Sequence, residues 1–155
     1  RDLFQLVDDH TSVVYVARGV ASHELVTPEW MAAKYALAPE RYVDFAVLRG
    51  DPSDGLPGVK GIGEKSATTL VAAYPSLEAM VAAAVDPGSG MSPSVRSKLL
   101  ADVDYLARAR EVVTCVDTLP MPDLTRSPVD DQRWDALAEN LALGGAATRI
   151  RALIA

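Results

Sequence analysis

The pattern of apolar and polar positions predicts a chain that is mostly helical after a short extended region. A β-branched and aromatic run at 13–16, preceded by a polar turn, predicts a strand. From position 27 onward apolar residues recur at helical spacing, and proline–acid pairs at 28–29 and 39–40 are typical of helix starts. We therefore expect one or two strands near the N-terminus, followed by helices.

Glycine and proline divide the rest of the chain. A helix at 64–74 is stopped by Pro75, and Ser76 caps a second one at 77–85. An apolar stripe runs from 94 to about 114, and a proline-containing connector leads to an amphipathic tail at 134–155. Between two helices, residues 50–63 form a polar, turn-rich stretch with five glycines.

Composition narrows the class of protein. The chain has 155 residues, of which 49% are hydrophobic and 23% charged, as in ordinary soluble domains, and no apolar run approaches the roughly 18 residues of a membrane span. A single cysteine, Cys115, and two histidines exclude an internal disulfide and a four-ligand zinc site. We expect a reducing, cytoplasmic location. Because the chain opens without methionine, we also expect it to be part of a longer protein.

The turn-rich stretch resembles a phosphate-binding loop only superficially. Gly58 and Gly63 are correctly spaced, but Glu64 separates the glycine from Lys65, whereas a phosphate loop needs glycine and lysine adjacent. The Gly61-Ile62-Gly63 triple instead suits a hairpin between two helices. Such a hairpin directs free backbone N–H groups at Gly63, Glu64 and Lys65 toward a phosphate, which predicts binding to a sugar-phosphate backbone without sequence preference.

Two aspartates just before this hairpin are candidate metal ligands. Asp51 and Asp54 stand three positions apart, with Pro52 restricting the chain between them. Two carboxylates at this spacing can converge on one hard cation, for which Mg²⁺ or Mn²⁺ is the natural occupant. The alternative is that both side chains cap backbone N–H groups of the turn.

These residues resemble a known signature. The run at 51–67 is similar to the signature of the bacterial 5′–3′ exonuclease and flap endonuclease family, which includes the 5′-nuclease domain of DNA polymerase I. The opening 1–7 resembles a second aspartate-containing segment of that family, with Asp2 at its second aspartate, and 42–45 fits the helix that leads into the signature. The resemblance covers about residues 1–117.

The resemblance implies a fold and a chemistry. The parent nuclease would be α/β overall, and this chain its mostly α carboxyl-terminal half with a helix–hairpin–helix region. Family members hydrolyse DNA phosphodiesters with two divalent cations. Matching residues imply that Asp2, Asp51 and Asp54 hold the second metal. They further imply that the hairpin binds duplex DNA through Lys60, Gly61, Gly63, Glu64 and Lys65, and that the carbonyls of Val59 and Ile62 bind potassium.

The resemblance also implies how the chain is divided into regions. Residues 1–50 would end the nuclease core, 51–118 would carry the metal acids and the hairpin, and 119–155 would form the connector and tail. The family's other metal-binding acids and its DNA-threading arch lie upstream of residue 1, so we expect this chain alone to be inactive and its partners to be that missing half and flapped, nicked or gapped DNA. Family members commonly have asparagine at Gly55, a departure that affects a turn.

Charge initially disfavours a DNA-binding protein, since the net charge is −6. Screening confines each charge to about 8–10 Å, however, so local placement matters more than the total. We expect Lys60 and Lys65 to carry most of the salt dependence, with Arg96 and Lys98 either contributing or simply facing solvent. Two hypotheses remain, a nuclease and a non-catalytic helix–hairpin–helix module, and Asp2 discriminates because a mere binding module needs no third acid.

Overall fold

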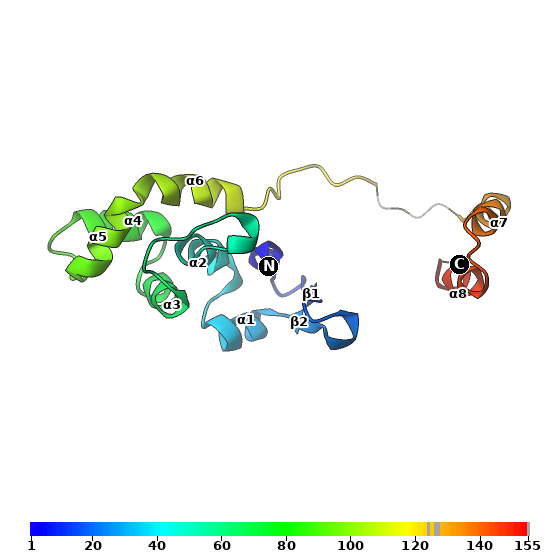
Figure 1. Cartoon of the computed structure of the whole chain (residues 1–155), viewed down its shortest axis with the longest axis horizontal. Helices are drawn as coiled ribbons and strands as arrows, with labels where there is room; N and C mark the ends of the chain where they lie inside the picture. The colour runs from blue at the N-terminus through cyan, green and yellow to red at the C-terminus, as the bar shows by residue number, and fades with distance from the viewer. Residues whose placement is uncertain (124, 126–127, 155) are drawn as a thin grey trace. The chain divides into compact units, whose positions relative to one another are not determined.

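The chain divides into two units. In this computed structural model, which describes residues 1–123, 125 and 128–154, the first unit is Arg1–Asp117 and the second is Thr118–Ala155 (Figure 1). Each unit is described by itself below.

In the described part of the chain, two strands form one small sheet. β1 (Val13–Tyr15) pairs antiparallel with β2 (Glu24–Val26), with Val13 opposite Val26. The predicted strand at 13–16 corresponds to β1. The apolar segment before it is a 3₁₀ helix, η1 (Asp2–Leu6), and a second one, η2 (Val20–Ser22), lies between the strands.

Two α-helices and a 3₁₀ turn follow the sheet. α1 (Pro28–Tyr35) begins as predicted, because the Thr27 side chain accepts the Trp30 N–H and proline opens the first turn. It ends at Tyr35, since Ala36 adopts a left-handed conformation. η3 (Pro39–Arg41) then leads into α2 (Tyr42–Arg49), which Gly50 ends with a φ of 79°.

Four helices complete the first unit (Figure 1). α3 (Glu64–Ala73) and α4 (Leu77–Val85) match the predicted spans closely. The apolar stripe at 94–114 is split into α5 (Pro93–Ala101) and α6 (Val103–Val113), because the backbone leaves the helical region at Asp102. Among the described residues, no single helix is long and apolar enough to cross a membrane, and α3 with α4 would pass that test only as a pair bent by 89°.

An aromatic cluster forms one end of the core. The Phe4 ring makes edge contacts with Tyr15, Trp30 and Tyr42, at centroid separations of 5.3–5.6 Å. Phe4 is fully buried, so the chain's opening segment is fixed against β1, α1 and α2. α2 also contacts α3 and α6, so it is the central helix of the first unit.

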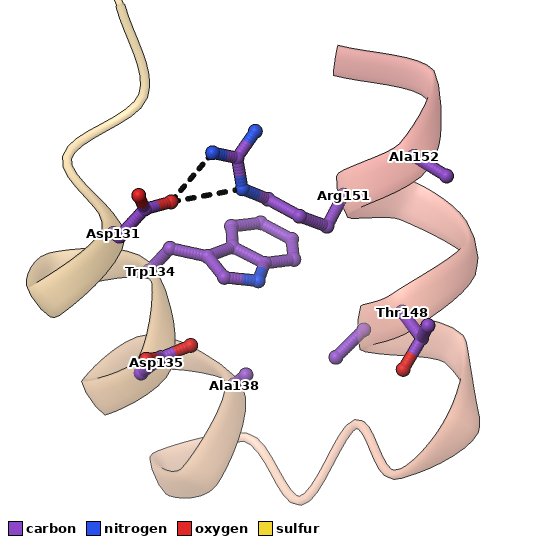
Figure 2. Close-up of a pocket in the computed structure, with 8 residues that line it drawn as sticks. Asp131, Trp134, Asp135, Ala138, Thr148, Arg151 and Ala152 are labelled. Carbon is purple, nitrogen blue, oxygen red and sulfur yellow. Dashed lines mark hydrogen bonds and ion pairs between the residues drawn. The ribbon is translucent and has the colours of Figure 1, made fainter. Parts of the chain in front are cut away.

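The second unit is a helical hairpin. α7 (Asp131–Asn140) and α8 (Gly145–Ile154) are joined by a short turn in which Gly144 has a positive φ. Trp134 and the Arg151–Asp131 ion pair lie between the two helices (Figure 2), and neither helix has a buried residue. Parts of the predicted connector and tail, namely 124, 126–127 and 155, lie outside the described residues.

The fold is the mostly helical arrangement that the sequence predicts, with a two-stranded sheet near the N-terminus. The sequence allowed for a second strand without locating it, because 24–26 contains a glutamate and is too short for a period-2 pattern.

Candidate functional site

Residues 51–57, here called the acid loop, close on themselves immediately after α2. The Asp51 N–H donates to the Leu56 carbonyl at 2.9 Å and the Leu56 N–H donates back to Asp51 at 3.0 Å, while η4 (Pro52–Asp54) forms the turn between them. Gly55 follows in a left-handed conformation with a φ of 74°. The loop therefore displays the Asp51 and Asp54 side chains from a short, hydrogen-bonded turn.

Two glycines fasten the acid loop to α2. A Cβ atom on Gly58 would lie 2.4 Å from the Arg49 carbonyl oxygen, and one on Gly50 would lie 2.5 Å from the Gly58 nitrogen. Both glycines also have positive φ angles. Only a residue without a side chain allows the two backbone segments to approach this closely. The chain beyond the loop is held there because the Val59 N–H donates to the Leu48 carbonyl.

The Asp51 carboxylate is already hydrogen-bonded. Its Oδ1 accepts the Ser53 N–H at 3.1 Å and the Ser53 hydroxyl at 2.5 Å, and its Oδ2 lies 3.6 Å from Arg49. The Ser53 hydrogen bonds, followed by the Arg49 charge, hold the pKa of Asp51 below its ordinary value. Asp51 thus performs the turn-capping role that the sequence left open, and it is a carboxylate at neutral pH.

The three predicted acids line one cavity. Asp2, Asp51 and Asp54 surround a polar hollow of about 380 Å³ that Arg1, Tyr15 and Ser53 also line. Asp2 is fixed there by η1, whose Phe4 is buried in the aromatic cluster. Nothing in the sequence pattern itself links positions 2 and 51, so their shared cavity is a product of the fold.

The donor set suits a hard divalent cation, because all three candidate ligands are carboxylates. Their spacing does not form a closed site, since no group of three His, Cys, Asp or Glu side chains in the described residues is arranged to hold an ion. The Ser53 and Arg49 contacts account for part of this, as they direct both Asp51 oxygens to protein partners. The acids therefore fit a cation in chemistry but require rearrangement around it.

Residues 58–65, here called the hairpin, follow the acid loop and precede α3. Val59 and Ile62 are buried, and the Ile62 N–H donates to the Val59 carbonyl at 2.9 Å. Gly61 has a φ of 80°, which favours glycine, and its carbonyl accepts the Lys98 ammonium at 3.0 Å. Lys98 therefore bonds to the hairpin and is only half-buried, so its charge lies at the hairpin surface.

The predicted phosphate-binding end of the hairpin is open. Gly63 is the N-cap of α3 and no side chain caps it, and a Cβ built there would meet nothing within 4 Å. The first N–H groups of a helix have no intrahelical partner and lie at the positive end of its dipole. Glu64, Lys65 and Lys60 are all exposed around this end. The geometry is that of an anion site with mixed flanking charges.

Tyr105 is a structural residue that the sequence pattern missed. Its hydroxyl accepts the Gly58 N–H at 2.9 Å and donates to the Val47 carbonyl at 3.1 Å, so α6 joins the end of α2 to the start of the hairpin. Burial raises the pKa of Tyr105, which keeps the hydroxyl protonated for donation. Asp102 adds a second tie, accepting the Lys60 N–H at 3.3 Å. The sequence signal for both ties was that Asp102 and Tyr105, two residues with polar groups three positions apart, interrupt the apolar stripe at 94–114.

Comparison with known proteins identifies the family. The family model described as 5'-3' exonuclease, C-terminal SAM fold, matches residues 37–135, which is more than half of the chain. This chain belongs to the 5′–3′ exonuclease family. The resemblance predicted from the acid loop and hairpin is therefore confirmed, and both segments lie inside the matched region.

Relatives extend the match of this 5′–3′ exonuclease family member over nearly the whole chain. It is 42% identical to a 5'-3' exonuclease of Streptomyces coelicolor over 156 residues, which cover 97% of the chain and 52% of the relative. It is 39% identical to a 5'-3' exonuclease of Mycobacterium tuberculosis, with the same coverages. A DNA polymerase I of Mycobacterium bovis is 41% identical over 87% of the chain and 14% of the relative.

A solved structure supports the fold. The T5 5'-exonuclease, in a structure described with bound divalent zinc ions, aligns with 94% of this chain and 45% of its own at a TM-score of 0.60 and 20% identity. The chain spans about half the length of the curated exonucleases that it matches. Its fold and family follow from these comparisons.

Proposed function

We propose that the whole protein is a structure-specific 5′–3′ exonuclease or flap endonuclease, and that this chain supplies second-metal ligands and the duplex-binding hairpin. The observation that carries the proposal is the cavity that Asp2, Asp51 and Asp54 share, because two of these acids lie on the acid loop that leads directly into the hairpin. Family membership supports DNA as the substrate of the whole protein, in replication or repair.

In this proposal the hairpin binds the duplex through its phosphates. The free N–H groups of Gly63, Glu64 and Lys65 donate to the oxygens of one phosphate, and the Lys60 and Lys65 ammonium groups lie on either side of it. The Gly61 carbonyl and the Lys98 ammonium keep the turn in the left-handed conformation that exposes those N–H groups. Contacts of this kind read backbone geometry, so binding is for flapped, nicked or gapped duplex and not for sequence.

The carboxylates would hold Mg²⁺ or Mn²⁺, directly or through water. A divalent cation bound there supplies positive charge against the phosphoryl oxygens of the scissile phosphate and lowers the pKa of a bound water. The protein's part is to keep Asp51 ionised, which the Ser53 hydrogen bonds do, and to fix Asp2 through η1. The chain spans about half of its relatives, so we propose that by itself it binds DNA without cutting it.

Potassium at the carbonyls of Val59 and Ile62 is the remaining part of the proposal. It rests on the family resemblance, and the turn does offer carbonyl oxygens to cations, since the neighbouring Gly61 carbonyl accepts the Lys98 ammonium. Carbonyl oxygens that bond an ammonium are of the ligand class that alkali cations use.

Fluorescence anisotropy with this chain and a labelled nicked duplex tests the proposal. We expect binding that weakens as salt rises, competition by unlabelled flap DNA, and no discrimination between two unrelated sequences. The same chain with Lys65→Met and Lys60→Met should bind less tightly. Equal affinity for the double variant and the wild type, or no binding at low salt, would contradict it.

The alternative of a non-catalytic helix–hairpin–helix module has one observation in its favour, which is that Asp51 caps the turn through Ser53. It leaves the convergence of Asp2 on the same cavity without a role. Mn²⁺ titration separates the two candidates, because a pure binding module has no carboxylate-dependent Mn²⁺ site.

A further inference from the structure

Arg49, the last residue of α2, lies between the acid loop and the hairpin. Its Nε donates to the Gly50 carbonyl at 3.1 Å and its guanidinium lies 5.3 Å from the centroid of the Phe45 ring. One terminal nitrogen is 3.6 Å from Asp51 Oδ2 and the other is 3.9 Å from Glu64 Oε2. The side chain is 17% exposed, so its position is set by these contacts.

The guanidinium is shared between two carboxylates without closing on either. Charge-assisted hydrogen bonds between a guanidinium and a carboxylate are about 2.7–2.9 Å long, and both distances here are longer. One of the carboxylates belongs to the proposed metal set and the other begins α3, beside the proposed phosphate site. The Arg49 charge can therefore move toward either side at small cost.

Binding events on the two sides act on this charge in defined directions. A divalent cation at Asp51 is repelled by the guanidinium, which occupies the same carboxylate. A DNA phosphate at the start of α3 attracts the guanidinium toward Glu64 and the helix N-terminus. Moving Arg49 toward the phosphate frees Asp51 Oδ2, and the two binding events consequently favour each other.

We propose that Arg49 is a positioning residue that couples DNA binding at the hairpin to the availability of Asp51 for a divalent cation. The inference rests on the proposed function and adds a regulation of the same site. In the absence of DNA, Arg49 holds Asp51 away from the cation and disfavours metal binding. When DNA binds at the hairpin, Arg49 moves toward the phosphate and the Asp51 carboxylate becomes available to a divalent cation beside the substrate.

The first test is Mn²⁺ affinity in the absence of DNA, measured by electron paramagnetic resonance of free Mn²⁺. Arg49→Gln should bind Mn²⁺ about three- to tenfold more tightly than the wild type, since one nearby positive charge is removed. Arg49→Lys keeps the charge and should change the affinity less. Arg108→Gln removes an exposed charge on a different helix, α6, and is the matched control. Thermal melts verify that each variant is folded.

The second test is the effect of Ca²⁺ on DNA affinity, measured by anisotropy at constant ionic strength. Ca²⁺ should tighten DNA binding by the wild type, and by a smaller factor in Arg49→Gln. Glu64→Gln, a change at an exposed side chain that does not depend on the packing of Arg49, should also reduce this factor. Unchanged Mn²⁺ affinity in Arg49→Gln, or an unchanged Ca²⁺ factor in both variants, overturns the coupling. Failure of the wild type to bind DNA overturns the proposed function instead.

Discussion

The acid loop and the hairpin are adjacent in sequence but are fixed by different means. The acid loop is held by short-range contacts, namely the Asp51–Leu56 bridge and the Ser53 hydrogen bonds. The hairpin is held from a distance, by Lys98 and by Asp102 at the junction of α5 and α6. The acid side chains can therefore be altered without removing the contacts that fix the hairpin, whereas the hairpin depends on helices about forty residues away.

The acid loop and the hairpin meet at Gly58, and a substitution there should destabilise both segments. Gly58→Ala combines a positive φ with a Cβ 2.4 Å from the Arg49 carbonyl oxygen. Strain and overpacking together should destabilise the first unit by about 3–5 kcal/mol, measured by chemical denaturation. Gly55→Ala is the control, because its φ is also positive but nothing lies within 4 Å of its Cβ. A loss in Gly58→Ala no larger than in Gly55→Ala would contradict the close-packing argument.

Removing a charge from the acid loop should separate chemistry from binding. In the full-length protein, Asp51→Asn or Asp54→Asn should lower the rate of Mg²⁺-dependent cleavage about a hundredfold or more, because the cation loses a ligand. DNA affinity without metal should change less than about threefold, since the hairpin is fixed independently. Single-turnover cleavage and anisotropy measure the two quantities. Equal losses in both would show that these acid side chains also help to fix the hairpin.

The long-range ties of the hairpin should be testable through Tyr105. Tyr105→Phe removes the hydroxyl that links the Gly58 N–H with the Val47 carbonyl. We expect a loss of about 1–2 kcal/mol of unfolding free energy, from two hydrogen bonds in a half-buried place. DNA affinity should fall as well, with Mn²⁺ affinity almost unchanged. If Tyr105→Phe loses Mn²⁺ affinity and keeps DNA affinity, Tyr105 supports the acid loop and not the hairpin.

Lys65 gives the smallest expected effect. Lys65→Met should reduce the slope of log affinity against log salt by about one, with little change in stability, since the side chain is exposed. Lys34→Met, on α1 and also exposed, is the matched control. Anisotropy over a series of salt concentrations measures the slope, and an unchanged slope would remove Lys65 from the proposed interface.

Much of the fold follows from local sequence signals. Thr27, Ser76 and Ser92 each accept a backbone N–H at the start of a helix, which is a property of three or four consecutive residues. The turn of the acid loop is local in the same sense. The domain ranges, the site residues and the cytoplasmic location stay predictions.

What the sequence did not predict depends on long-range contacts. The roles of Tyr105 and Asp102 arise because α6 packs on α2, and no spacing rule relates position 105 to 58. The break at Asp102 was hidden because apolar residues continue on both sides of it. Arg49 was overlooked because its two carboxylate partners are brought to it by the closure of the acid loop.

The central claim is that Asp2, Asp51 and Asp54 hold a divalent cation beside DNA bound at the hairpin. Anomalous diffraction from Mn²⁺ in crystals of the full-length protein with a nicked duplex tests it most directly. We expect a peak within coordination distance, directly or through one water, of at least two of these carboxylates, with a phosphate at the N-terminus of α3. Mn²⁺ bound elsewhere, or DNA that leaves the hairpin free, would contradict it.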